Sequence, residues 1–181
     1  MGPRAGQGQR PQGKPGTMEA SRESWEETIA AIASGTGGAI GIVRLSGPEA
    51  VAVANRVWRG AAPLSRERPR RLCLGRCRRA DAPDTPGDPA LAVVMPGPAS
   101  YTGEDVVEIH GHGGSLAPAR LLAALLAAGA RAAEPGEFTR RAFLNGKLDL
   151  TQAEAVADIV RARSDTALRL AERQMDGLLG R

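Results

Sequence analysis

YTGEDVVEIHGHGG, residues 101–114, is the stretch that decides the fold, because its order of residue types predicts a turn, a strand over residues 105–109, a glycine-rich turn and a helix start. Glu108 lies in the middle of that strand, between Val107 and Ile109. A buried carboxylate is costly unless it is paired. Two alternatives follow: the polar face of the strand meets solvent, or Glu108 accepts paired N–H donors from a ligand.

Short apolar runs on both sides of this stretch predict further strands, over residues 28–33, 40–45, 71–78 and 90–95. A segment rich in Pro and Asp, residues 81–89, predicts a loop. Capping residues, prolines and terminal glycines predict helices over residues 46–58, 115–129 and 134–146. Strands and helices are mixed without strict alternation, so the sequence predicts an α+β fold with a mixed sheet of about five strands and flanking helices.

The C-terminal part of the chain has a different pattern. A capping box at residues 151–154 (TQAE) begins an apolar stripe at helical spacing that reaches Leu178. We expect one long helix without a full packing partner within the chain, which is either the start of an incomplete helical domain or a helix that docks on another chain. The predicted division is a disordered tail over residues 1–24, an α+β domain over residues 25–147 and the helical segment over residues 148–181.

The composition of the chain excludes several classes of function. The chain has 181 residues, a net charge of +4 and 3% aromatic residues, which argues against aromatic platforms for single-stranded nucleic acid. Two cysteines cannot build a disulfide framework. The sequence shows neither a secretory signal nor a membrane span. We therefore expect a cytoplasmic protein without membrane contact, with a mitochondrial location as the alternative.

Three other patterns allow different functions. Cys73, Cys77, His110 and His112 could supply four zinc ligands, although their spacing matches no strong zinc motif, and the simpler interpretation is structural. The arginine-rich stretch from Arg56 to Arg79 could form a basic RNA-binding module, or an ordinary solvated surface, which is favoured because no RNA-binding motif is interleaved. The sequence contains no Walker-type loop and no dinucleotide fingerprint after a strand.

The segment EPGEFTRRAFLNGKLDL, residues 134–150, is dense in polar side chains. Arg140 and Arg141 are consistent with ordinary charge on a helix surface. Lys147 is the only lysine in the part that we expect to be ordered, and it follows a predicted helix end, where a cation suits the helix dipole. The segment also joins the two predicted domains, a common place for a ligand cleft.

Three stretches together resemble the N-terminal domain of the tRNA-modification GTPase family MnmE (also called TrmE). They are TIAAIAS…GAIGIVRLSGPEA, PGPASYTGEDVVEIHGHGG and EPGEFTRRAFLNGKLDLTQAEAVADIV, which span residues 28–160. The resemblance implies a domain similar to the folate-binding domains of aminomethyltransferases. It also implies a homodimer that binds a tetrahydrofolate derivative (5-formyl- or 5,10-methylene-tetrahydrofolate) at its interface. With the flavoprotein MnmG, the family adds an aminomethyl-type group to the wobble uridine of tRNA.

The resemblance places three folate-binding positions in this chain: Arg44 in IVRLSG, Glu108 in GEDVVE and Lys147 in LNGKLDL. It implies no catalytic residue and no metal ligand here. The chemistry is consistent, because the 2-amino group and the adjacent ring N–H of a pterin form a two-donor edge that a carboxylate accepts. Arg44 and Lys147 carry cations that bind carbonyl or carboxylate oxygens.

Two features depart from the family pattern. The usual TPPGRGG loop is SGTGGA here, residues 34–39, which lacks the prolines and the arginine beside Arg44. The sequence ends at Arg181, so the family's GTP-binding domain, with its magnesium and potassium, lies outside these residues. We expect no GTPase activity from this chain alone.

Overall fold

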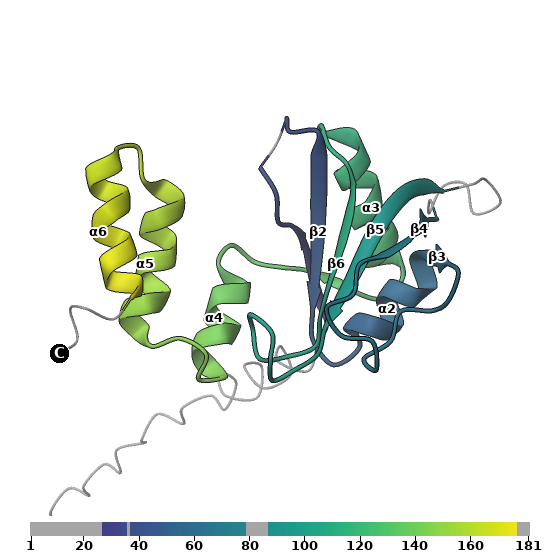
Figure 1. Cartoon of the computed structure of the whole chain (residues 1–181), viewed down its shortest axis with the longest axis horizontal. Helices are drawn as coiled ribbons and strands as arrows, with labels where there is room; N and C mark the ends of the chain where they lie inside the picture. The colour runs from purple at the N-terminus through teal and green to yellow at the C-terminus, as the bar shows by residue number, and fades with distance from the viewer. Residues whose placement is uncertain (1–26, 36, 79–86, 177–181) are drawn as a thin grey trace, which may run out of the picture.

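The computed structural model describes residues 27–35, 37–78 and 87–176. Seven strands form one sheet in the order β3-β4-β5-β6-β2-β1-β7 (Figure 1). The strands are β1 (Ile29–Ile32), β2 (Ile40–Ser46), β3 (Trp58–Gly60), β4 (Cys73–Cys77), β5 (Asp88–Met95), β6 (Val106–His112) and β7 (Arg131–Ala132). The helices are α2 (Ala50–Val57), α3 (Leu116–Ala127), α4 (Glu137–Leu144), α5 (Leu150–Arg161) and α6 (Asp165–Met175). The predicted α+β class is confirmed.

The hydrophobic core lies between one face of the sheet and helices α2 and α3. On β2 and β6 the alternate residues Val43, Leu45, Val107 and Ile109 are fully buried, as the two-residue period of a strand requires. Leu125 of α3 is also fully buried and joins the same apolar cluster. The residues between these positions therefore point to the opposite face of β2 and β6, where the candidate site lies.

The sheet is larger than the predicted five strands. Two edge strands were not predicted: β3, of three residues, which begins where α2 ends, and β7, of two residues, which pairs parallel with β1. Such short strands show too little alternation to be recognised in a sequence. Strand β6 also continues to His112, through residues predicted as a turn, because Ile40 and Gly41 of β2 pair with His112 and Gly111.

The C-terminal segment is a helical hairpin, so the prediction of one long helix is wrong. Helices α5 and α6 lie side by side, on the far side of α4 from the sheet (Figure 1). Ala155 and Ala171 are buried between the helices, and Gln152 Nε2 donates to the Met175 carbonyl at 3.0 Å. The chain turns at Ser164, whose hydroxyl accepts from the Ala167 N–H and caps α6.

The capping box of the first helix lies at residues 149–152, two residues earlier than the predicted box at residues 151–154. The box joins Asp149 and Gln152: the Asp149 carboxylate accepts from the Gln152 N–H at 2.8 Å, and the Gln152 side chain accepts from the Asp149 N–H at 3.0 Å. Within the described residues, no helix combines the length and the apolar character that a membrane crossing requires. The predicted tail over residues 1–24 and most of the predicted loop over residues 81–89 lie outside the described residues.

Candidate functional site

Glu108 and Arg44 face each other across the β2–β6 pair. The antiparallel register places Arg44 directly opposite Glu108. Nε of Arg44 donates to Oε1 of Glu108 at 2.8 Å, and Nη2 forms an ion pair with the same oxygen at 2.7 Å. The two side chains are 28% and 15% exposed, so the pair is half-buried on the sheet face opposite α2 and α3. The carboxylate that the sequence placed in mid-strand thus has a charged partner within the chain.

His110 contacts the other oxygen of the same carboxylate. It lies two residues further along β6, on the same face, and its Nε2 is 3.2 Å from Oε2 of Glu108. Both oxygens of Glu108 therefore accept hydrogen bonds or lie at hydrogen-bonding distance from a donor, and the orientation of the carboxylate is fixed. From the sequence, His110 was expected to be a structural residue or, less simply, a zinc ligand, and its contact with Glu108 was not predicted.

Two aromatic rings lie against the Arg44 guanidinium. Its Cζ is 5.4 Å from the ring centroid of Tyr101 and 5.7 Å from that of Phe138, within the range of cation–π attraction. Tyr101 comes from the loop before β6, and Phe138 comes from the first turn of α4. The Tyr101 hydroxyl is 3.0 Å from Oγ1 of Thr139, which joins the loop to the helix.

Lys147 lies beyond the end of α4, where its backbone N–H donates to the Ala142 carbonyl at 2.8 Å. Its side chain lies against the turn at Gly103, since a Cβ on that glycine would be 3.4 Å from Lys147 Cγ. Arg44 and Glu108 thus contact each other directly, and Lys147 reaches the loop that carries Tyr101. Lys147 is thus connected to the Arg44–Glu108 pair through the loop that carries Tyr101 and Gly103.

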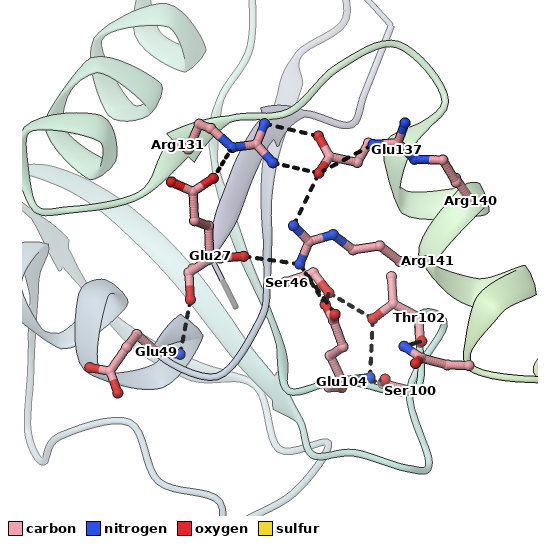
Figure 2. A network of polar contacts seen from close by, with 12 residues as sticks. Glu27, Ser46, Glu49, Ser100, Thr102, Glu104, Arg131, Glu137, Arg140 and Arg141 are labelled. Carbon is pink, nitrogen blue, oxygen red and sulfur yellow. Dashed lines mark hydrogen bonds and ion pairs between the residues drawn. The ribbon is translucent and has the colours of Figure 1, made fainter. Parts of the chain in front are cut away.

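Helix α4 is anchored beside this site by a buried ionic network, which Figure 2 shows. At its centre, the side chains of Arg141 and Glu137 are 0% and 1% exposed, and Arg141 Nη2 donates to Glu137 Oε1 at 3.0 Å. Arg141 Nη1 donates to the Glu27 carbonyl at 3.0 Å and to Glu104 Oε2 at 3.1 Å. The interpretation of Arg141 as surface charge is therefore wrong.

The network continues into the sheet and the Tyr101 loop. The Ser46 hydroxyl donates to Glu104 Oε2 at 2.6 Å and is 2.7 Å from the Thr102 hydroxyl. Ser46 lies two residues after Arg44 on β2, on the same face. Asn145, at the end of α4, donates through Nδ2 to the Thr102 carbonyl at 2.7 Å. The network therefore holds the end of β2, the loop and α4 as one unit.

The charge of Glu137 is strongly stabilised. Burial alone would raise its pKa, but hydrogen bonds from the Arg131 side chain, the Glu134 backbone N–H and Arg141 outweigh burial and lower the pKa to about 2. In return, the contacts to Glu137 and Glu27 raise the pKa of Arg131 above its usual value. A sequence signal for this cluster exists in EFTRR, where Glu137 and Arg141 have the i,i+4 spacing of a helical ion pair.

The structure places Cys73 and Cys77 away from His110, so the four side chains considered for a zinc site are not gathered in one place. Cys73 and Cys77 lie on β4 and pack against the core, whereas His110 lies on the opposite face of the sheet, beside Glu108. Burial raises the pKa of the Cys77 thiol to about 12, which disfavours the thiolate that binds metal. Among the described residues, no three His, Cys, Asp or Glu side chains form a group that could hold a metal ion.

The described arginines of this stretch, from Arg56 to Arg78, are spread over several elements. They belong to α2, β3, the connection between β3 and β4, β4 itself and the residue after it. Most of those with described contacts bind backbone carbonyls, and one binds a carboxylate; they are Arg56, Arg59, Arg66, Arg68, Arg70 and Arg76. This distribution favours the interpretation of this stretch as ordinary protein surface.

Comparison with known proteins identifies the family. Residues 28–147 match the family described as GTP-binding protein TrmE N-terminus. The tRNA modification GTPase MnmE of Symbiobacterium thermophilum is 56% identical over 164 residues, which cover 85% of this chain and 34% of that protein. The proteins of the same name from Roseiflexus castenholzii and Geobacter sulfurreducens are each 53% identical, over 86% and 85% of this chain and 33% and 34% of their own lengths.

The chain therefore belongs to the TrmE N-terminal family. The resemblance noted in the sequence is confirmed over the whole described α+β part. The chain spans about a third of the length of the curated relatives that it matches.

Proposed function

We propose that this chain binds a tetrahydrofolate derivative, 5-formyl- or 5,10-methylene-tetrahydrofolate, through Glu108, Arg44 and Lys147. The observation that carries the proposal is the Glu108 carboxylate, which is half-buried and fixed by contacts to both oxygens. Its Oε1 accepts a hydrogen bond from Nε and forms an ion pair with Nη2, two nitrogens bonded to one carbon of the planar Arg44 guanidinium. The edge of a pterin that carries the 2-amino group and the ring N–H presents the same planar N–C–N donor pair.

In this proposal each residue has a separate task. Glu108 accepts the two-donor edge of the pterin. Arg44 then turns to a carbonyl or carboxylate oxygen of the same ligand, and Lys147 binds a further oxygen beside the Gly103 turn. The membership of the TrmE N-terminal family supports this assignment, because all three residues lie within the matched region 28–147.

The wider role follows from the relatives' name, tRNA modification GTPase. We propose that the chain acts in the cytoplasm as a homodimer and works with an MnmG-type flavoprotein in modifying the wobble uridine of tRNA. The bound folate supplies the one-carbon unit. GTP, magnesium and potassium are bound outside this chain's residues. The exposed apolar side chains Ile40, Leu74 and Leu91, on the same sheet face as Arg44, support self-association.

Isothermal titration calorimetry with 5-formyl-tetrahydrofolate tests the site. Glu108→Gln replaces an acceptor by a donor that faces another donor, and should weaken binding about ten- to hundredfold, because a hydrogen bond to a charged group contributes about 1.5–3 kcal/mol. Arg44→Ala should weaken folate binding by a comparable factor. Lys147→Ala should weaken folate binding by a smaller factor, because an ammonium near a domain edge keeps more of its hydration.

The matched control is Arg71→Ala, an exposed arginine of the basic stretch. It should bind folate within about twofold of the parent, since exposed charges contribute little. A parallel titration with tRNA distinguishes the alternative function. If Glu108→Gln binds folate as tightly as the parent while tRNA affinity depends on the Arg56 to Arg79 stretch, the chain is an RNA-binding module and the folate proposal is wrong.

A further inference from the structure

Aromatic residues are scarce in this chain and gather at Arg44. The sequence contains one tyrosine, two phenylalanines and two tryptophans. The tyrosine, Tyr101, and one phenylalanine, Phe138, are 37 positions apart in the sequence, and both place their rings within 6 Å of the Arg44 guanidinium. Both rings are half-buried, so part of each remains accessible. Two of the five aromatic residues therefore lie at one half-buried ion pair, an arrangement that suits the binding of a ligand.

The backbone segments that carry the two rings are fixed. The loop of Tyr101 is held by Thr102 and Glu104, whose side chains bind Ser46 and Arg141 (Figure 2). Phe138 directly follows the buried Glu137 on α4, and the Tyr101 hydroxyl contacts Thr139 of the same helix. A ring surface that is fixed before binding loses little conformational entropy when a ligand arrives.

The group that the rings now contact resembles the proposed ligand edge. A guanidinium is flat and carries N–H donors around one carbon, as the N–C–N edge of a fused pyrimidine ring does. At this site the flat donor group meets a carboxylate, Glu108, and two ring faces together. The same three groups suit a flat heterocycle, since aromatic side chains stack on base-like rings and add affinity that hydrogen bonds alone do not supply.

We propose that Tyr101 and Phe138 are ligand-contacting residues that stack on the flat pyrimidine part of the heterocycle whose donor edge Glu108 accepts. They select for a fused ring of this shape over an open-chain guanidine or amidine with the same donors. This inference rests on the proposed folate site and adds its specificity-determining residues.

Calorimetry with two ligands, 5-formyl-tetrahydrofolate and pterin-6-carboxylate, tests this on the intact chain. Phe138→Leu and Tyr101→Leu should each weaken both ligands by a similar factor, about fivefold to 100-fold, because both ligands contain the stacked ring. Tyr101→Phe keeps the ring and should stay within about threefold. Phe143→Leu, on the same helix but facing the groove between α4 and α5, is the matched control and should bind as the parent does.

A double-mutant cycle separates ligand contact from a role in holding Arg44. In an Arg44→Ala background, Phe138→Leu should still cost the same factor if the ring touches the ligand. If Phe138→Leu no longer weakens binding in the Arg44→Ala background, the inference is wrong while the folate site stands. The same conclusion follows if, in the otherwise unchanged chain, Phe138→Leu and Phe143→Leu bind the ligands with equal affinity. If the parent itself binds neither ligand, the proposed function fails and the inference fails with it. Thermal unfolding of each variant confirms that the fold is retained.

Discussion

Replacing Glu137 by glutamine should remove the main pH-dependent stabilisation that the buried network provides. The pKa of Glu137 is lowered from 4.5 to about 2 because Arg131, the Glu134 backbone N–H and Arg141 stabilise its charged form against the opposing effect of burial. A carboxylate with a lower pKa in the folded state binds fewer protons there than in the unfolded chain. Its contribution is therefore complete above about pH 4.5 and is lost as the pH falls toward 2.

The expected loss of unfolding free energy follows from the pKa shift of Glu137. Each pKa unit corresponds to about 1.4 kcal/mol, so the shift of Glu137 corresponds to about 3 kcal/mol of unfolding free energy at neutral pH. Glu137→Gln also leaves the fully buried Arg141 with one carboxylate fewer, and unpairing a buried charge costs about 3–5 kcal/mol. Because Glu104 still binds Arg141, we expect the lower end of this range, about 3 kcal/mol.

Urea unfolding of the parent and the variant at about pH 7, 4.5 and 3.5 measures this difference. Glutamine does not titrate, so the gap between the two proteins should be widest at about pH 7 and narrower by about 1.4 kcal/mol at pH 3.5. Glu134→Gln is the matched control, because Glu134 is also a carboxylate at the start of α4 but is 63% exposed. Its cost should stay below about 1 kcal/mol at every pH. If the difference in unfolding free energy between the parent and Glu137→Gln is constant from about pH 7 to 3.5, the network does not stabilise the charge of Glu137 and this assignment is refuted.

Three further predictions concern the fold and its assembly. Gly75→Ala should destabilise the protein by about 1–3 kcal/mol in urea unfolding, because a Cβ there would lie 2.4 Å from Cζ2 of the buried Trp58, whereas Gly111→Ala, with 4.0 Å to its nearest contact, should not suffer this clash. Asp149→Ala should cost about 1 kcal/mol in the same assay through the loss of the α5 cap, and Thr151→Ala less than half of that; equal costs would contradict the observed capping box. Sedimentation velocity at micromolar concentration with folate present should show a dimer, and a single species of 18.8 kDa would exclude the proposed homodimer under these conditions.

Local sequence patterns were sufficient for the central sheet and its helices. The apolar run of residues 40–45 predicted β2, the alternation in residues 105–109 predicted most of β6, and Gly129 correctly marked the end of α3. The same alternation showed that Glu108 needs a partner, and its partner in the chain is Arg44, which lies 64 residues earlier. Periodicity gives the face on which a residue lies but carries no information on which strand becomes its neighbour.

The errors arose where tertiary contacts decide the outcome. The apolar stripe after residue 151 would suit one long helix, but Ser164 and Asp165 provide an N-cap and an acidic first turn, and the buried Ala155 and Ala171 let two shorter helices pack together. Arg140 and Arg141 are adjacent and share the same sequence neighbours, yet only Arg141 is fully buried. Its burial depends on Glu104 and on the Glu27 carbonyl, which come from distant parts of the chain.

This dependence connects the stability of the chain to the candidate site. Helix α4 has eight residues, too few to be stable as an isolated helix in water, so its position must come from tertiary contacts. The contacts that hold it are ionic and buried, and a buried arginine is tolerated only when its partners are all in place. Those partners belong to the strand ends, the Tyr101 loop and the start of α4, which are the segments that surround Arg44 and Glu108. A change that disrupts the network therefore moves the rings and Lys147 together, and loss of ligand binding should accompany loss of α4 packing even where Arg44 and Glu108 are intact.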